Sequence, residues 1–186
     1  MFNKVTKSVR ILSAAGVEEA GSGHPGMPLG MADVGTVLYK KFLKVSNENP
    51  SWINRDRFIL SPGHGSMLLY SLLHLNGFDI SIEDLKNFRQ LKSKTPGHPE
   101  LDTSLGIDMT TGPLGQGFST GVGFALAERY LSELLGEDII NHFTYGIVSD
   151  GDLMEGVSFE AAELASVWKL GKLIYIFDDN NISIHG

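Results

Sequence analysis

The 186-residue sequence contains no cysteine. A disulfide framework and thiolate chemistry are therefore excluded, and a reducing compartment suits such a chain. No apolar run is long enough to cross a bilayer, and the first residues, MFNKVTKSVRILSAAG, are too polar for a signal peptide. We therefore predict a cytoplasmic protein that does not enter membranes.

Positive charge is also scarce. The sequence has 15 lysine and arginine residues against 22 aspartate and glutamate residues, which gives a net charge of -7 and a pI near 5.3. This balance argues against nucleic acid as the main partner. It still allows an anionic small ligand, because such a ligand responds to local groups rather than to the total charge.

Hydrophobic periodicity predicts an alternation of helices and strands. Helices are expected over Val5–Val17, Val34–Phe42, Met67–Leu75, Phe118–Leu135 and Glu155–Leu170, and a further one from Ser81 onward, where Ser81-Ile-Glu-Asp84 has a capping-box pattern. Strands are expected over 57–61, 143–150 and 172–179, and loops over 21–30 and 94–117. The last strand, helix and strand predict a right-handed βαβ unit with parallel strands. The fold class is therefore α/β, a parallel sheet with helices on both faces.

The chain stops at Gly186, directly after the last expected strand and its loop. An α/β domain normally covers such a strand with a further helix. We therefore expect residues 1–186 to form one domain that lacks its C-terminal end.

Polar residues follow the last two expected strands. Asp150 comes after one strand, and Asp178, Asp179 and Asn180 come after the next. Ligands of parallel sheets collect at the carboxyl ends of strands, and Gly151 with the following helix offers backbone N–H groups to a diphosphate. Because Asp150 would repel a diphosphate, a divalent cation has to lie between them. Mg²⁺ accepts such oxygen ligands, so we predict a metal held by Asp150, Asn180 and a loop carbonyl.

Each motif alone also permits a simpler interpretation. Asp150 could be a helix N-cap, and DDNN could be an Asx turn. Asp152 is expected to be a first-turn acid that the helix dipole favours. A dinucleotide motif in GQGFSTG is disfavoured, because its third glycine comes one place late and no clear strand precedes it.

Five ordered motifs resemble those of one family. VSDGDLMEG with Asn180, thirty positions after Asp150, resembles the thiamine diphosphate motif Gly-Asp-Gly…Asn, although Ser149 stands where that motif has glycine. GSGHPG, SPGHGS, FRQLKSKTPGHP and TTGPLGQG occur in the order seen in transketolases. The resemblance runs from Lys7 to Gly186 and implies the N-terminal, diphosphate-binding (PP-type) domain of a transketolase.

The resemblance implies a set of cofactor ligands. Asp150, Asn180 and the backbone carbonyl of Ile182 would bind Mg²⁺ or Ca²⁺, with Asn180 also counted among the cofactor-binding residues. The backbone N–H of Gly151 and the side chain of His64 would contact the diphosphate of thiamine diphosphate.

The resemblance also implies how the remaining motifs act. Gly112 and Leu114 would meet the aminopyrimidine of the cofactor. His24 and His98 would line the substrate channel and handle hydroxyl and carbonyl oxygens of a sugar phosphate. Glu155 would lie at a dimer interface that links two active sites.

The residues themselves support the histidine assignments independently. His24, His64 and His98 are each flanked by glycine or proline in expected loops, where imidazole can donate to phosphate and shuttle protons near neutral pH. His74 and His142 have no such setting, so we expect them to be structural or exposed.

The resemblance implies transfer of a two-carbon ketol unit from a ketose phosphate to an aldose phosphate, the transketolase reaction of the pentose phosphate pathway. The pyrimidine-binding domain and the glutamate that activates the cofactor are absent from these residues. We therefore expect a homodimer or association with the missing domain or subunit, and no activity from this piece alone. The alternatives are another thiamine diphosphate enzyme, such as a dihydroxyacetone synthase or an α-keto acid dehydrogenase component, and a non-catalytic cofactor-binding subunit.

Overall fold

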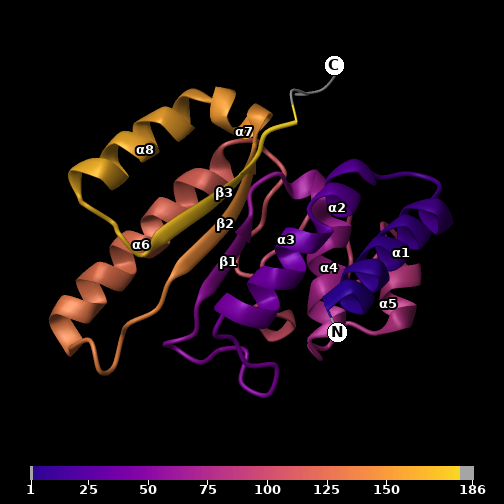
Figure 1. Cartoon of the computed structure of the whole chain (residues 1–186), viewed down its shortest axis with the longest axis horizontal. Coiled ribbons are helices and arrows are strands. Elements are labelled where there is room, and N and C mark those ends of the chain that lie inside the picture. Colours follow the sequence, from indigo (N-terminus) through magenta and orange to yellow (C-terminus); the bar gives the residue numbers. More distant parts are fainter. Residues whose placement is uncertain (1, 181–186) are drawn as a thin grey trace. The chain divides into compact units, whose positions relative to one another are not determined.

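The computed structural model describes residues 2–180, which fold as two compact units. The first unit comprises residues 2–50 and 63–110, and the second comprises residues 51–62 and 111–180. Figure 1 labels the helices and strands of both units. The expectation of one diphosphate-binding domain over residues 1–186 stays a prediction.

The first unit is helical. Its long first helix, α1, packs against α3, α4 and α5, and the hydrophobic side chains of α4 from Met67 to Leu73 are buried. The elements are α1 (Phe2–Ala20), α2 (Gly26–Gly30), α3 (Ala32–Val37), the π-helical turn η1 (Leu38–Phe42), the 3₁₀ turn η2 (Gly63–Gly65), α4 (Ser66–Leu75), α5 (Ile82–Lys86) and the 3₁₀ turn η3 (Thr103–Leu105). The four helices expected in this unit are thus present, and Ser81 and Asp84 form the expected capping box of α5.

The loop expected over residues 21–30 is shorter than the sequence suggested. Gly26–Gly30 forms the short helix α2, with Pro28 in its first turn. The missing N–H of a proline is harmless there, because first-turn N–H groups have no partner within the helix. Prolines and glycines alone were therefore a poor guide to the end of this loop.

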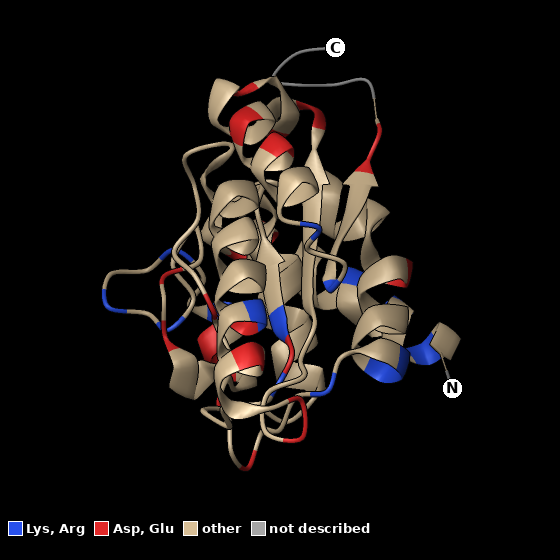
Figure 2. Cartoon of the chain, turned by 90° about the vertical axis from the view of Figure 1, so that its left-hand side faces the viewer, with Lys and Arg blue, Asp and Glu red and all other residues tan. Residues whose placement is uncertain are grey.

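The second unit contains the sheet. Three strands lie in the order β1-β2-β3, and both neighbouring pairs are parallel, as the arrows in Figure 2 show. After β1 the chain runs through residues 63–110 of the first unit and then through α6 to β2, and it passes from β2 to β3 through α7 and α8. The elements are β1 (Arg57–Leu60), α6 (Gln116–Leu135), β2 (Thr144–Ser149), α7 (Asp150–Met154), α8 (Gly156–Val167) and β3 (Leu173–Asp178). The predicted parallel α/β class is confirmed.

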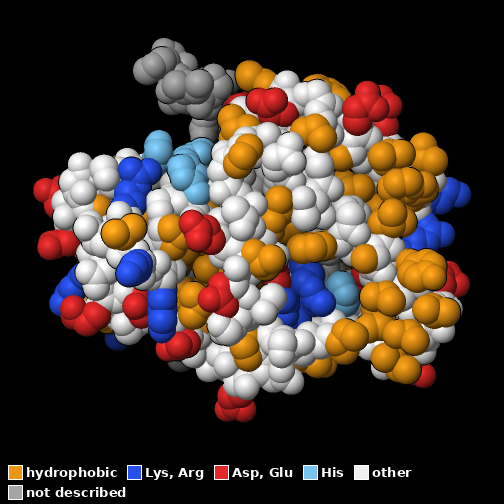
Figure 3. Space-filling view, turned by 180° about the vertical axis from the view of Figure 1, so that it is seen from behind, with side chains coloured by type: hydrophobic (Ala, Val, Ile, Leu, Met, Phe, Trp, Pro, Cys, Tyr) orange, Lys and Arg blue, Asp and Glu red, His pale blue; other side chains and the backbone are white. Residues whose placement is uncertain are grey.

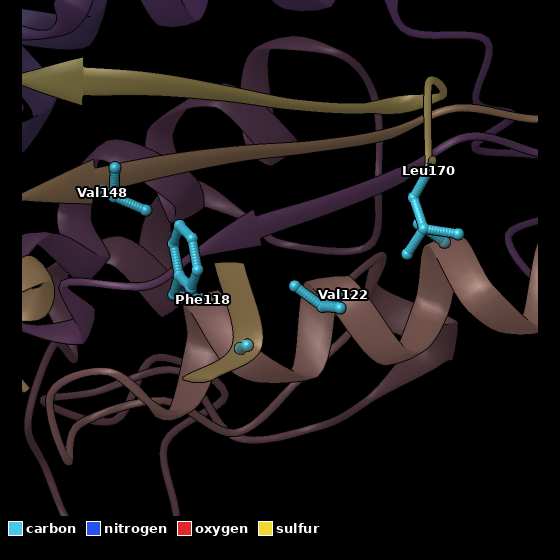
Figure 4. Close-up of a cluster of buried hydrophobic side chains, with 6 residues drawn as sticks. Phe118, Val122, Val148 and Leu170 are labelled. Atoms are coloured by element: carbon cyan, nitrogen blue, oxygen red, sulfur yellow. The ribbon is translucent and has the colours of Figure 1, made fainter. Parts of the chain in front are cut away.

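Helix α6 packs on this sheet through a buried hydrophobic cluster. Phe118 and Val122 of α6 meet Val148 of β2 and Leu170 of the segment before β3 (Figure 4). Ala161 of α8 belongs to the same cluster. The burial of these apolar side chains is what fixes the two helices against the strands.

Two glycines leave room for Tyr175 of β3. A Cβ atom at Gly121 of α6 would lie 2.0 Å from the Tyr175 hydroxyl, and one at Gly146 of β2 would lie 2.3 Å from the ring. The ring stacks on Phe118 with centroids 4.4 Å apart, and its hydroxyl donates a hydrogen bond to the Phe118 carbonyl. Gly121 therefore allows close packing of Tyr175 against the continuous helix α6.

The expected helix over residues 155–170 has different bounds in the structure. A separate helix, α7, begins immediately after β2, and Glu155 interrupts the helical path with a ψ of 133° before α8 begins. Strand β2 therefore runs directly into a helical turn, and Asp150 is the first residue of that turn.

Candidate functional site

The carboxyl ends of β2 and β3 meet in the second unit. Ser149 and Asp178 are register partners in the last rung of the parallel pair. Asp150 follows the first of them and Asn180 follows the second, and the Asn180 backbone N–H donates a hydrogen bond of 3.3 Å to Oδ2 of Asp150. The structure thus brings together the two residues that the sequence placed at neighbouring strand ends. Figure 2 shows acidic segments at this end of the sheet.

The side chain of Asn180 is oriented by a second hydrogen bond. Its Nδ2 donates to Oδ2 of Asp178 over 3.1 Å. The nitrogen end of the amide is therefore turned toward Asp178, which sets the direction of the opposite, oxygen end.

The donor set suits a hard divalent cation. Asp150 supplies carboxylate oxygens and Asn180 an amide oxygen, and Mg²⁺ and Ca²⁺ prefer such ligands. Among residues 2–180, no group of three His, Asp or Glu side chains could hold a metal ion. A site here therefore needs oxygens from outside these side chains, as a Mg²⁺–diphosphate site does. The third predicted ligand, Ile182, lies outside the described residues.

The N-cap interpretation of Asp150 is wrong. Ser149 is the N-cap residue of α7, and Asp150 occupies the first helical position. Ser149 can cap the helix with its own hydroxyl group, so the carboxylate of Asp150 is not used for that purpose. The Asx-turn interpretation of DDNN falls partly on residues that the structure does not describe.

Gly151 and Leu114, both expected at the cofactor, lie together. A Cβ atom at residue 151 would be 3.1 Å from Cδ1 of Leu114, and Gly151 itself is buried. Leu114 belongs to the TGPLG loop, residues 111–115, which also contains Gly112. This loop adopts left-handed backbone at Gly112 and at Gly115, with φ of 153° and 79°, which favours glycine there.

Glu155 lies between α7 and α8 with an exposed side chain. Its Cβ is close to the TGPLG loop, because a Cβ atom at Gly115 would lie 2.8 Å from it. The residue predicted for a dimer interface is thus at the surface, next to the loop expected to meet the aminopyrimidine.

Sequence reasoning missed the role of Asp152. Asp152 lies in the first turn of α7, which confirms the prediction of a first-turn acid, but its side chain is also fully buried. Its Oδ1 accepts hydrogen bonds from the Ser61 hydroxyl (2.7 Å) and the Gly115 N–H (2.9 Å), and its Oδ2 accepts from the N–H and hydroxyl of Ser149 (both 3.2 Å). The only local sequence signal was the three-residue spacing between Ser149 and Asp152, which is that of a capping box.

The first unit gathers the three predicted histidines. The rings of His24 and His64 lie edge to face with centroids 5.1 Å apart. The charge of His24 also lowers the pKa of His98, so those two imidazoles are within electrostatic reach. Figure 3 shows histidine side chains gathered beside lysine and arginine side chains on one face.

Helix α4 holds the loop that carries His98. The Ser66 hydroxyl donates to the Gly97 carbonyl and the Tyr70 hydroxyl to the Pro96 carbonyl, both over 2.8 Å. A loop anchored on a buried helix presents its histidine in a defined position, which a substrate-handling role requires.

Arg89 lies beside the same loop. Its backbone is left-handed, with φ of 64°, and a Cβ atom at Gly97 would be 2.9 Å from its Nε. Partial burial, the Arg89 guanidinium and His24 together lower the pKa of His98 below its ordinary value near 6.5. His98 is therefore predominantly neutral near pH 7, a state in which imidazole both donates and accepts hydrogen bonds.

His74 and His142 were expected to be either structural or exposed, and the structure shows that both are structural. The Nδ1 of His74 is hydrogen-bonded to the Ile80 carbonyl over 2.7 Å. His142 is 5% exposed, and burial together with the nearby Arg57 lowers its pKa to about 4. The GQGFSTG segment forms the start of α6 after a loop rather than after a strand, so it is not a dinucleotide motif.

The sequence matches the family described as "Transketolase, thiamine diphosphate binding domain" over residues 2–186. The transketolase of Bacillus subtilis (strain 168) is 57% identical over 98% of this chain and 28% of its own length, and transketolase 1 of Escherichia coli (strain K12) is 55% identical over the same shares. A crystal structure of transketolase from Campylobacter jejuni superposes with a TM-score of 0.95, at 55% identity over 98% of this chain and 29% of that one. A transketolase complex with sedoheptulose 7-phosphate from Pichia stipitis gives a TM-score of 0.94, at 49% identity over 98% of this chain and 27% of that one.

Fold and sequence together define a thiamine diphosphate binding domain of the α/β class. The chain belongs to the transketolase, thiamine diphosphate binding domain family. It spans 28% of the length of the two curated relatives. Within residues 2–180, no helix has the length and apolar character needed to cross a membrane.

Proposed function

We propose that this chain is the diphosphate-binding part of a transketolase, with residues 1–186 forming one PP-type domain. The whole enzyme transfers a two-carbon ketol unit from a ketose phosphate to an aldose phosphate, as in the pentose phosphate pathway of the cytoplasm. The observation that supports this most is the hydrogen-bonded pair of Asp150 and Asn180 at adjoining strand ends, in a chain that matches this family over residues 2–186.

Asp150, Asn180 and the Ile182 carbonyl hold Mg²⁺, with Ca²⁺ as the substitute. The cation offsets the negative charge that a diphosphate brings to an acidic strand end. Gly151 donates its backbone N–H to the diphosphate, and the side chain of His64 also contacts the diphosphate. The buried position of Gly151 and its close approach to Leu114 support a tightly fitted cofactor surface at this loop.

Gly112 and Leu114 receive the aminopyrimidine, the first through its backbone and the second through its side chain. When bound, thiamine diphosphate supplies a carbanion and an electron sink for cleavage next to a carbonyl group. The protein's share is to orient the reactants and to move protons.

His24 and His98 bind the hydroxyl and carbonyl oxygens of the sugar phosphate. A neutral His98 suits this work, because it can accept a proton from a hydroxyl group or donate one to a carbonyl oxygen. The lowered pKa of His98 supports that protonation state at neutral pH.

The active enzyme is a homodimer in which a separate pyrimidine-binding domain supplies the glutamate that activates the cofactor. Glu155 lies at the dimer interface and hydrogen-bonds across it, and its exposed side chain supports this role. The family match favours a transketolase over a dihydroxyacetone synthase or an α-keto acid dehydrogenase component.

The test is an activity assay of the full-length protein with a ketose phosphate donor and an aldose phosphate acceptor. Chelation and dialysis should abolish turnover, and thiamine diphosphate with Mg²⁺ should restore it, whereas the 186-residue chain should stay inactive under all conditions. Full-length protein without ketol transfer, or turnover by the 186-residue chain alone, would contradict the proposal.

A further inference from the structure

Asp152 has more partners than its position in a short helix requires. Its carboxylate is completely buried and accepts four hydrogen bonds, two at each oxygen. A buried carboxylate is costly unless its oxygens are satisfied, so this network is a specific structural device.

The two oxygens of Asp152 serve different purposes. Oδ2 accepts from Ser149 three residues earlier, which is the local contact of a helix cap. Oδ1 accepts from Ser61, 91 positions away after β1, and from Gly115, 37 positions away in the TGPLG loop. A helix cap accounts for the first oxygen and leaves the second unexplained.

The contact with Gly115 fixes one end of the TGPLG loop. Gly115 is the N-cap residue of α6 in a left-handed conformation, and its N–H is bound to Asp152 over 2.9 Å. Leu114 precedes it directly and packs against Gly151. The Ser61 hydroxyl that donates to Asp152 also accepts from the Phe118 N–H over 2.9 Å, so the first turn of α6 is tied to the same network.

We propose that Asp152 is a positioning residue that holds the TGPLG loop against Gly151 and so fixes the surface on which the cofactor binds. The inference rests on the proposed function, because it assigns Gly112, Leu114 and Gly151 to cofactor binding. Asp152 itself touches none of the reacting atoms and acts through Gly115 and Ser61.

The network requires an acceptor at all four contacts. Asparagine has nearly the same shape, but one carboxylate oxygen becomes an NH₂ group that can only donate. A donor facing the Ser149 N–H loses that hydrogen bond, and a donor facing the Gly115 N–H loses the contact to the loop. Either orientation of the amide therefore breaks part of the network.

The experiment compares Asp152→Asn with Ser158→Ala in the full-length protein. Ser158 donates its hydroxyl to the backbone carbonyl of Asp152 over 2.6 Å, so its removal deletes a buried hydrogen bond at the same residue without touching the carboxylate. The measurements are hydrogen–deuterium exchange of residues 111–117, read by mass spectrometry, and the Kd of thiamine diphosphate with Mg²⁺, read by calorimetry.

Asp152→Asn should speed exchange in residues 111–117 and raise the Kd by about tenfold, as expected for the loss of a hydrogen bond to a charged group. Ser158→Ala should leave both within twofold of the unchanged protein. Equal losses in the two variants, or an unchanged Kd in both Asp152→Asn and Ser61→Ala, would overturn the inference. If Asp152→Asn does not fold, Ser61→Ala, which removes one of the four donors, should show the same direction of change, and no change there would also overturn it.

Failure of the proposed function gives a different result. In that case the unchanged protein itself does not bind thiamine diphosphate. The exchange of residues 111–117 still reports whether Asp152 positions the loop.

Discussion

The backbone N–H of Asn180 donates a 3.3 Å hydrogen bond to the carboxylate of Asp150, thirty positions earlier in the chain. This contact exists because β2 and β3 are parallel neighbours, so that residues following each strand emerge at one edge of the sheet. The carboxylate of Asp150 and the backbone of Asn180 thereby meet at the edge where we propose the metal-bound diphosphate.

His98→Ala in the full-length enzyme should lower kcat/KM by about 100-fold, the usual scale of a lost proton-transfer or hydrogen-bonding group. The Kd of thiamine diphosphate should stay unchanged, because His98, unlike His64, is not among the proposed ligands of the cofactor. Steady-state kinetics and calorimetry measure the two quantities. An equal loss in both would show that His98 has been misplaced.

The pKa of His98 should depend on Arg89. Diethyl pyrocarbonate modifies neutral imidazole, so the pH midpoint of its reaction at His98, followed by peptide mass spectrometry, reports the pKa. Arg89→Gln should raise the midpoint toward 6.5, because removal of a cation favours the protonated ring.

Lys92→Gln is the matched control. Residue 92 has nearly the same left-handed backbone as residue 89, with φ of 63° and 64°, but Lys92 is not among the groups that shift the pKa of His98. The control should leave the midpoint unchanged. An unchanged midpoint in Arg89→Gln, or an equal rise in both variants, would rule out Arg89 as the source of the shift.

Stability should fall as the pH drops from 6.5 toward 4, and His142 should cause part of the fall. The folded protein keeps His142 neutral down to a pKa of about 4, whereas the unfolded chain binds a proton near pH 6.5. The unfolded state thus binds more protons in this window, so the free energy of unfolding rises with pH. Acidification from pH 6.5 to 4 therefore removes a contribution of His142 on the order of 3 kcal/mol.

Urea unfolding at several pH values, in parallel with His142→Asn, measures this contribution. The variant lacks the titrating ring and should show a shallower pH dependence between pH 6.5 and 4. Identical slopes for the two proteins would contradict the assignment.

Two glycines of α6 should respond oppositely to alanine. Gly121→Ala places a methyl group against the Tyr175 hydroxyl and should destabilise the protein by about 1–3 kcal/mol. Gly123 has no atom within 4 Å of a built Cβ, so Gly123→Ala should stabilise the helix by about 0.5–1 kcal/mol.

Thermal unfolding of both variants, and of Gly121→Ala combined with Tyr175→Phe, tests this packing. Removal of the hydroxyl should recover part of the loss at residue 121. Equal effects of the two alanines, or no recovery of stability by Tyr175→Phe, would show that the Tyr175 hydroxyl does not limit the space at residue 121.

Local patterns predicted the parts of the fold that local chemistry determines. The strand endings near Asp150 and Asn180 could be read from apolar runs followed by polar residues, and the Ser81 capping box was visible in four letters. The network of Asp152 could not be read in this way, because its partner Ser61 lies 91 positions away and only the folded sheet brings the two together. The short helix that contains Pro28 was missed because a first-turn proline looks the same as a loop proline in the sequence.

The most direct test of the account is the Kd of thiamine diphosphate for the full-length protein, measured by calorimetry with and without Mg²⁺. Asp138→Ala, which removes an exposed acid from the second unit, controls for the change in net charge. Asp150→Ala should weaken Mg²⁺-dependent binding by about 100-fold or more, since even the outer-shell partners of a metal ligand contribute 10- to 100-fold, and Asp138→Ala should leave it unchanged. An unchanged Kd in Asp150→Ala, or an equal loss in both variants, would contradict the metal-bridged diphosphate site.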